Sequence, residues 1–302
     1  MQAADSSVSG WQRGVERVVA HLQTVVRSGA ALPDLAELAA IAHQSPYHFH
    51  RVYRALTGEP VGQTVARLRL SQALHLLGRG DASVTEVALA VGYQTPQALA
   101  RACRNALQAS PSVLRASPAL RASKLQQLSA PPSGARVASA PLAVSVQTLE
   151  PFELVVLRKR GAFDDLDRGF GQIVAWAART GVVDHLQCLV GLPLSDHRDV
   201  PAHAHLFECG VGFATSAFAT PAAPLQLRHL NGGLHAVLRQ VGSYAGLEDA
   251  LDCMLAFWLP GSGYVLREAP VHYLFLDDPE ETPEATLRAD IRIPVATGDS
   301  HL

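Results

Sequence analysis

Two short segments of the chain, fifty residues apart, follow the same pattern. One begins with Ser45-Pro46 and the other with Thr95-Pro96. A hydroxyl side chain can accept a hydrogen bond from a free amide of the first helical turn, and proline fits the first helical position. Apolar residues then recur every three or four residues, the period of one helix face. The pattern predicts two equivalent amphipathic helices, with Phe49, Val52, Tyr53 and Leu56 inward in the first and Ala98, Leu99, Ala102, Cys103 and Ala106 inward in the second.

The opposite face of both helices is polar and carries no acid. It holds Tyr47, His50, Arg51 and Arg54 in the first helix, and Gln97, Ala100, Arg101 and Arg104 at the equivalent positions of the second. A shorter amphipathic segment and a turn precede each helix. The first of these segments is predicted to be a helix over 35–42 with Leu35, Leu38, Ala39 and Ala42 inward, and the second covers 84–91. This order is typical of the helix-turn-helix unit, which lays its second helix in the DNA major groove.

Charge divides the chain into two parts. Residues 1–122 hold 12 Arg against 7 acids, whereas residues 123–302 hold 13 Lys and Arg against 20 acids, so that the whole chain has a net charge of −2. A basic half joined to an acidic half indicates that only the first meets nucleic acid. The four cysteines are scattered, no apolar run is long enough for a membrane span, and no signal peptide is recognisable. We therefore expect a cytoplasmic protein with reduced thiols and no metal, since His203 and His205 lie in a connection rich in proline and alanine.

The first half resembles the AraC/XylS family DNA-binding domain over about residues 10–118. The runs that carry the resemblance are SPYHFHRVYRALTGEP, ARLRLSQALHLL and VTEVALAVGYQTPQALARACRNALQASPSVLR. The resemblance implies a monomer-competent module of seven helices, whose two recognition helices enter adjacent major-groove segments on one face of the DNA. It implies that Tyr47, His50, Arg51, Gln97 and Arg101 read bases and that Arg54 and Arg104 meet phosphates. Cys103 departs from the family, which usually has an aromatic core residue there.

Residues 123–141 contain three prolines and no periodicity, which predicts a flexible linker. The remainder contains an internal repeat. VVLRKRGAFDDLDRGF at 155–170 aligns with AVLRQVGSYAGLEDAL at 236–251, which matches Gly161 to Gly242 and Phe163 to Tyr244. Each copy predicts a strand, a turn of glycine and an aromatic residue, a helix and further strands. Such a pseudo-twofold α+β fold places a cleft between its repeats, a common position for a ligand.

The second half resembles the GyrI-like effector-binding domain over 142–296, and the two halves together resemble Rob-like regulators. The Phe257-to-Tyr264 run FWLPGSGY and the DIRIP ending carry this resemblance, with the two glycine-aromatic turns. In that family an organic, often cationic, ligand meets aromatic residues and a buried carboxylate. Here Tyr273 occupies the place of the acid. A neutral phenol does not balance a cation, so we expect a neutral or weakly polar ligand, or none. The candidate ligand residues are Tyr273, Trp258, Tyr244 and Phe163.

These observations predict two domains, an all-α tandem helix-turn-helix domain at 10–120 and an α+β pseudo-twofold GyrI-like domain at 142–296. The first hypothesis is a sequence-specific transcriptional regulator, without enzymatic activity or cofactor, that binds double-stranded DNA and a small-molecule effector. RNA polymerase is the expected protein partner, and the protein is expected to be a monomer or dimer. Two alternatives remain. The GyrI-like domain can be a hydrolase or sequestering protein for a toxic small molecule, although the missing acid argues against hydrolysis, or it can bind a protein partner and no ligand.

Overall fold

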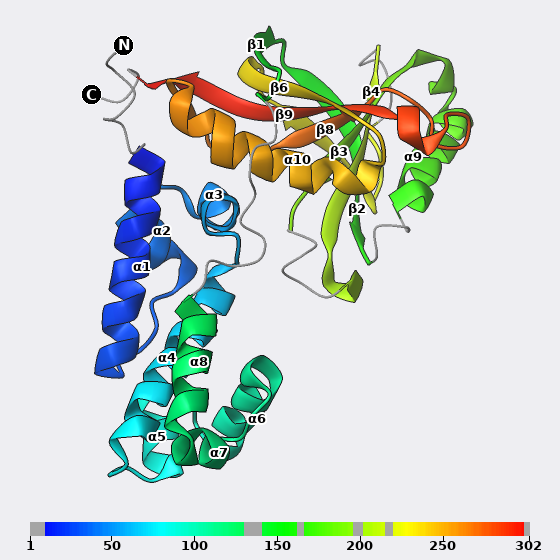
Figure 1. Ribbon diagram of the computed structural model, residues 1–302. Coiled ribbons are helices and arrows are strands. Elements are labelled where there is room, and N and C mark those ends of the chain that lie inside the picture. The colour runs from blue at the N-terminus through cyan, green and yellow to red at the C-terminus, as the bar shows by residue number, and fades with distance from the viewer. Residues whose placement is uncertain (1–9, 130–140, 162–165, 196–201, 215–219, 299–302) are drawn as a thin grey trace. The chain divides into compact units, whose positions relative to one another are not determined.

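The chain divides into two compact units, residues 1–137 and 138–302. The computed structural model describes residues 10–129, 141–161, 166–195, 202–214 and 220–298 (Figure 1). The first unit is all helical and the second is built on a nine-stranded antiparallel sheet. The predicted fold class is therefore confirmed.

The described part of the first unit contains eight helices. Their bounds are α1 Gly10–Ser28, α2 Leu35–Ala42, α3 Pro46–Thr57, α4 Val61–Arg79, α5 Val84–Ala90, α6 Pro96–Leu107, α7 Pro111–Ala116 and α8 Pro118–Ser129. Asp34 and Ser83 begin α2 and α5 with reciprocal capping boxes to Glu37 and Glu86. The same capping solution thus begins the first helix of both helix-turn-helix motifs.

Each helix-turn-helix motif has its own hydrophobic core. One core joins α1, α2 and α3 around Phe49 and Tyr53, and the other joins α5, α6 and α7 around Leu99 and Leu107. The long helix α4 contributes to both, with Val65 in the first core and residues 70–77 in the second. It connects the two motifs through apolar packing, as its many apolar residues predict.

Four details differ from the sequence predictions. Leu35 is exposed, because it lies in the first turn of α2 ahead of the buried Leu38. Ala106 is also exposed, and Leu107 takes the inward position of α6. Thr95 accepts a capping hydrogen bond from the Ala98 amide, but the Ser45 side chain makes no such bond. The predicted linker begins too early, because α8 continues to Ser129 and Leu128 is buried in the second core.

The second unit consists of strands, two main helices and short helical turns. The strands are β1 Val144–Leu149, β2 Phe152–Arg160, β3 Leu186–Pro193, β4 Leu206–Phe213, β5 Leu225–Leu230, β6 Gly233–Val241, β7 Tyr264–Leu266, β8 His272–Phe275 and β9 Arg288–Thr297. The helices are α9 Leu166–Thr180 and α10 Leu247–Cys253, which continues as a π-helix over Met254–Trp258. Short 3-10 turns cover Val183–His185, Ala202–Ala204, Tyr244–Gly246, Leu259–Gly261 and Glu284–Thr286.

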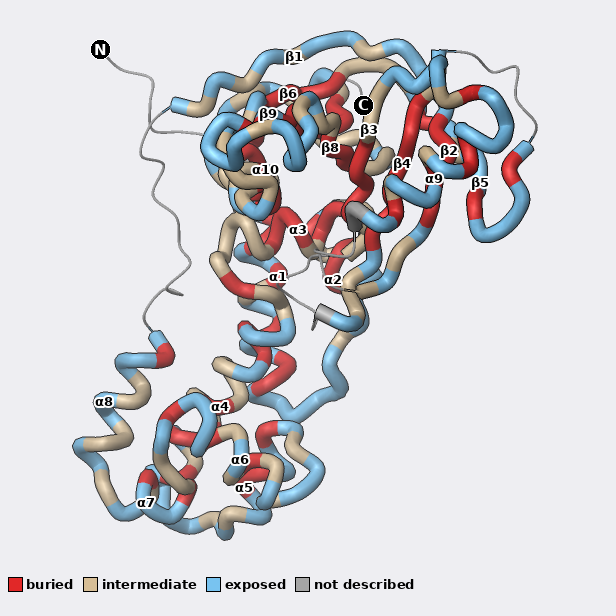
Figure 2. Tube along the Cα trace, turned by 90° about the vertical axis from the view of Figure 1, so that its right-hand side faces the viewer, coloured by how far each residue is buried: buried red, intermediate tan, exposed pale blue. Residues whose placement is uncertain are grey.

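The strand order β1-β6-β9-β8-β3-β4-β2-β5 shows the duplication directly. The centre is the antiparallel pair β3–β8, and the sequence of strands outward from it is equivalent on both sides. The edge strands are exchanged, because β1 precedes β2 but pairs with β6, and β5 precedes β6 but pairs with β2. Strand β4 is buried over most of its length (Figure 2). The two repeats are therefore interlocked in one sheet.

Equivalent ion pairs and turns mark the two repeats. Arg158 pairs with Glu208 between β2 and β4, and Arg239 pairs with Asp290 between β6 and β9. Strands β2 and β6 are each followed by a glycine with a positive φ angle, 147° at Gly161 and 116° at Gly242. Residues with a side chain rarely adopt this backbone conformation. The repeat predicted from sequence is thus present in backbone geometry and in side-chain pairing.

Candidate DNA-reading surface and effector site

Helix α6 presents the predicted polar residues of the second motif on one exposed face. Gln97, Arg101 and Arg104 are all exposed and lie at intervals of four and three residues. Leu99 and Cys103 anchor the opposite face and are fully buried. Burial raises the pKa of the Cys103 thiol to about 11, so it stays protonated and behaves as a small apolar residue. The arrangement leaves two guanidinium groups and an amide on the surface of a capped, rigid helix.

Helix α3 differs from this arrangement at one predicted residue. Arg51 is 5% exposed, although the sequence predicted an exposed base-reading side chain. His48 and Val52 are also buried. His50 and Arg54 are partly exposed, and the Tyr47 side chain lies outside the described part of the structure. The predicted reading residues of α3 therefore differ in exposure, with Arg51 buried and His50 and Arg54 partly exposed.

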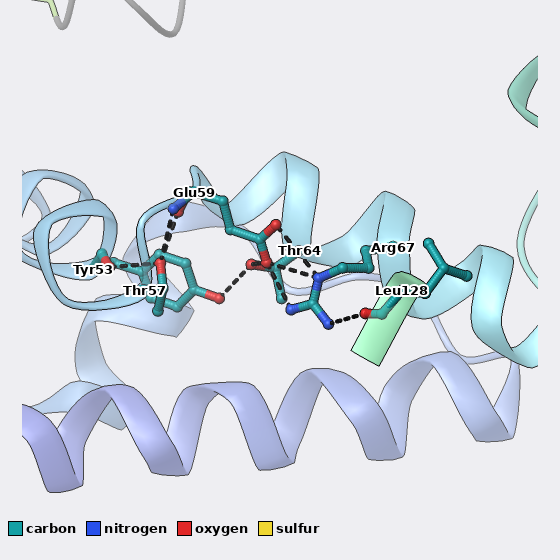
Figure 3. Close-up of polar contacts among 6 residues, drawn as sticks. All are labelled: Tyr53, Thr57, Glu59, Thr64, Arg67 and Leu128. Atoms are coloured by element: carbon teal, nitrogen blue, oxygen red, sulfur yellow. Dashed lines mark hydrogen bonds and ion pairs between the residues drawn. The ribbon is translucent and has the colours of Figure 1, made fainter. Parts of the chain in front are cut away.

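A buried polar network lies where α3 meets α4 (Figure 3). The hydroxyl of Tyr53 donates to Thr64 Oγ1 at 2.7 Å, and the Thr64 hydroxyl donates to Glu59 Oε1 at 2.7 Å. Burial raises the pKa of Tyr53 to about 12, so it remains a donor at neutral pH. Arg67 Nη2 donates to Glu59 Oε1 at 2.6 Å, and Arg67 Nη1 donates to the Leu128 carbonyl at 3.2 Å. No role for Arg67 was evident from the sequence, and only the fold shows that it connects α4 to the α3–α4 turn and to α8.

In the second unit both helices cover the same face of the sheet. Leu157, Cys209, Gly191 and Tyr273 are cross-strand partners in β2, β4, β3 and β8, so their side-chain positions share that face. A Cβ atom built on Gly169 of α9 would lie 2.4 Å from Cys209 Sγ, which shows how closely α9 approaches it. Tyr273 contacts α10. The central strands β3 and β8 therefore form a floor to which both repeats contribute.

Tyr273 lies beside a carboxylate, that of Glu248. The Tyr273 hydroxyl donates to Glu248 Oε1 of α10 at 2.8 Å, and the two residues are 1% and 5% exposed. The expectation that no acid lies at this place was wrong, because a helix supplies it where the strand does not. The internal repeat held a signal, since Glu248 and Asp167 occupy equivalent positions after Leu247 and Leu166.

Aromatic rings continue the floor beyond Tyr273. The ring centroid of Phe275 lies 4.9 Å from that of Tyr244 and 5.8 Å from that of Phe170. At Gly191 a Cβ atom would lie 2.5 Å from Phe207 Cζ and 3.0 Å from a Phe275 ring carbon. The missing side chain thus lets rings from β4 and β8 approach the backbone of β3. Phe170, Phe207 and Phe275 were not among the ligand residues predicted from the sequence.

The other predicted ligand residues are placed less centrally. Tyr244 uses its hydroxyl to donate to the backbone carbonyls of Asp277 and Arg288, at 2.8 and 3.1 Å, so that it also fastens a loop. Trp258 stacks on Tyr264 with centroids 6.1 Å apart. Phe163 lies outside the described residues. Of the four candidates, Tyr273 thus lies on the same strand as Phe275, and Tyr244 contacts the Phe275 ring.

The opposite face of the sheet holds two buried histidines. His272 and His235 are 2% and 3% exposed, and their rings meet edge-on with centroids 5.5 Å apart. Burial lowers the pKa of His272 to about 3, with His235 and Arg292 adding to the effect. Both imidazoles are therefore neutral at pH 7. Within the described ranges no three His, Cys, Asp or Glu residues lie together as a metal site, and no helix is long and apolar enough to cross a membrane.

Each of the two units contains a segment that matches a known protein family. Residues 142–296 match the GyrI-like small molecule binding domain, more than half of the chain. The chain belongs to the GyrI-like family. Residues 38–117 of this GyrI-like protein match a helix-turn-helix domain, so the resemblance to an AraC-type reader joined to a GyrI-like domain is confirmed.

Curated relatives match this GyrI-like protein over short stretches. The MmsAB operon regulatory protein of Pseudomonas aeruginosa is 35% identical over 82 residues, 27% of each chain. The probable transcriptional regulator YgiV of Escherichia coli K12 is 33% identical over 67 residues, 22% of this chain and 42% of YgiV. The chain thus spans less than half the length of either relative. Among solved structures, an EcmrR–DNA complex covers 88% of this chain and all of the EcmrR chain, at 13% identity and a TM-score of 0.44.

Proposed function

We propose that the protein is a sequence-specific transcriptional regulator whose GyrI-like domain binds a small organic effector. The domains of this proposal keep the predicted boundaries, a reader over 10–120 and an effector domain over 142–296, with α8 as an addition to the reader. The helix-turn-helix match, the regulator names of the curated relatives and the positive charge of the first unit all support it. Double-stranded DNA is the nucleic-acid partner, and RNA polymerase is the protein partner that such a regulator requires.

The observation that carries this proposal is the exposed face of α6. Gln97, Arg101 and Arg104 extend from a helix whose start is capped and whose opposite face is fully buried. Arginine can donate two hydrogen bonds to the major-groove edge of guanine, and glutamine can pair in the same way with adenine. We assign base reading to Tyr47, His50, Arg51, Gln97 and Arg101, and phosphate contacts to Arg54 and Arg104.

For the effector we propose an aromatic or largely apolar molecule with one hydrogen-bond-donating group, neutral or cationic. The rings of Phe275, Phe170 and Tyr244 supply an apolar surface, and Glu248 supplies the acceptor beside Tyr273. This widens the expected ligand class, since a buried carboxylate balances a positive charge, whereas a phenol does not. We assign binding rather than catalysis to this site, because the domain is joined to a helix-turn-helix domain and the curated relatives carry the names of regulators.

Selection from a random pool of duplex DNA tests the first part of the proposal. The full-length protein should enrich one motif with two half-sites on the same face of the duplex, and recovery of unenriched sequences would contradict it. A thermal-shift screen then tests the second part. Lipophilic amines and neutral aromatic donors should raise the melting temperature, because a ligand that binds only the folded state stabilises it. Aromatic carboxylates serve as the matched control and should not. If only the carboxylates stabilise the protein, the assignment of Glu248 as the ligand acceptor is wrong.

A further inference from the structure

Reading two half-sites at once requires that the two recognition helices keep a fixed separation. In helix-turn-helix proteins, half-sites read on one face of the duplex are about one helical turn apart, and one inserted base pair moves a half-site by about a tenth of a turn. In this chain α3 and α6 belong to separate cores that share α4. Long helices are rarely straight and curve gently, so one shared helix does not by itself fix the distance between the two motifs. A second connection between the cores would therefore add rigidity where the function needs it.

The network around Glu59 makes such a connection on the side of α3. Glu59 lies in the turn between α3 and α4 and is 6% exposed. It receives hydrogen bonds from Thr64 Oγ1 and from both Nε and Nη2 of Arg67, at 2.7, 3.0 and 2.6 Å. The Tyr53 hydroxyl continues the chain of hydrogen bonds into the core of the first motif (Figure 3). The carboxylate thus joins the end of α3 to the middle of α4.

Arg67 extends the connection to α8. Its Nη1 atom donates to the Leu128 carbonyl in the last turn of that helix, at 3.2 Å. A guanidinium group at this position satisfies a carbonyl that has no partner within the helix and complements the negative end of the helix dipole. Because its nitrogens form a rigid planar fork, one arginine can hold Glu59 and the helix end simultaneously, which lysine cannot do in the same geometry.

Helix α8 is in turn fastened to the second motif. The Leu128 side chain is buried in the second core with Leu99 and Leu107 of α6. The neighbouring Gln127 donates from Nε2 to the Ala106 carbonyl in the last turn of α6, at 3.4 Å. Arg121 donates to the carbonyls of Leu114 and Arg115 at the end of α7, at 3.0 and 2.8 Å. A continuous path therefore runs from α3 through Glu59, Arg67 and α8 to α6.

We propose that Glu59 and Arg67 are positioning residues, which fix the separation of the two reading helices by tying both to α8. Neither residue contacts DNA in this account, and their effect is on which half-site spacing the protein accepts. The proposal rests on the proposed function, because spacing has meaning only if α3 and α6 read DNA. Helix α8 becomes part of the reader, beyond the seven helices that the family resemblance implies.

Half-site spacing selectivity of the full-length protein is the test. The DNA probes are the motif selected by the wild-type protein and versions with one base pair inserted or removed between the half-sites. The wild-type protein should bind the selected spacing at least about tenfold more tightly, because a displaced half-site loses a bidentate base contact. In Arg67→Met the affinities for the three spacings should converge. Arg67→Lys keeps the charge beside Glu59 but loses the fork, and should give an intermediate ratio.

Arg115→Met is the matched control. Arg115 also donates to a backbone carbonyl, that of Ala82 at 2.6 Å, but both residues lie within the second motif. This variant should lower the melting temperature and keep the wild-type spacing ratio. If Arg67→Met unfolds, Arg67→Lys alone decides. A wild-type ratio in every folded Arg67 variant would overturn the positioning role, whereas a wild-type protein that enriches no DNA motif would overturn the proposed function itself.

Discussion

The Tyr273 hydroxyl donates a hydrogen bond to Glu248 Oε1 at 2.8 Å and so ties strand β8 to helix α10 in the second unit. Tyr273 also pairs in register with Gly191 of β3, the strand from the other repeat. Tyr273 thus connects the central strands of both repeats to the Glu248 carboxylate of α10. In the proposed function the effector contacts this pair, so substitutions of Tyr273 and Glu248 test the effector site.

Replacing Tyr273 with phenylalanine removes this hydrogen bond and keeps the ring. We expect the free energy of unfolding to fall by about 1–3 kcal/mol, because a buried carboxylate loses a donor. Glu248→Gln is the matched change, since it keeps the shape and removes the charge. Urea unfolding of both variants measures the stability. A stabiliser found in the thermal-shift screen should lose more affinity in Glu248→Gln if it is a cation than if it is a neutral donor. Equal losses for cations and neutral donors would remove Glu248 from cation recognition.

Acid should weaken the protein through His272. Its pKa is about 3 in the folded protein, against 6.5 when exposed. Between these values the unfolded chain binds a proton that the folded protein does not, so stability is complete above pH 6.5 and decreases as the pH falls towards 3. At pH 5 the loss from this one group is about 2 kcal/mol. In His272→Leu the difference in urea midpoint between pH 7.5 and pH 5 should shrink. An unchanged difference would show that other groups cause the acid sensitivity.

Much of the fold was predictable because it depends on local signals. Capping residues, prolines and apolar periodicity predicted α2, α3, α5 and α6, and the internal repeat predicted the pseudo-twofold sheet, since both patterns lie in consecutive residues. The exchange of β1 and β5 left no such signal, because register between distant strands depends on the whole sheet. For the same reason Glu248 was missed. Its place beside Tyr273 results from the packing of a helix on a strand 25 residues away.

The first part of the predicted linker, residues 123–129, is helical. These residues lack a clear apolar period, but Leu128 is buried in the second core and Arg67 donates a hydrogen bond to the Leu128 carbonyl in the last turn of the helix. A helix with little apolar pattern can form where tertiary contacts supply the free energy.

That correction changes where the reader should be cut. A fragment of residues 1–129 should be more stable than one of residues 1–122, because the longer fragment keeps a buried leucine, worth about 2–3 kcal/mol, and the Arg67 contact. Both fragments retain α3 and α6. Urea unfolding compares them directly, with Leu128→Ala in the longer fragment as the control. If the two fragments unfold at the same urea concentration, α8 contributes nothing to the reader.

The most direct test of the regulator assignment compares two arginines on one face of α6. Arg101→Ala and Arg104→Ala remove the same charge from exposed positions three residues apart, so differences between them report on what each contacts. Affinity should be measured on the selected motif and on random duplex DNA over a series of salt concentrations. Arg101→Ala should lose about 1–3 kcal/mol on the motif and little on random DNA, whereas Arg104→Ala should weaken both alike and flatten the salt dependence. If both variants weaken the motif and random DNA by the same factor, α6 does not read bases.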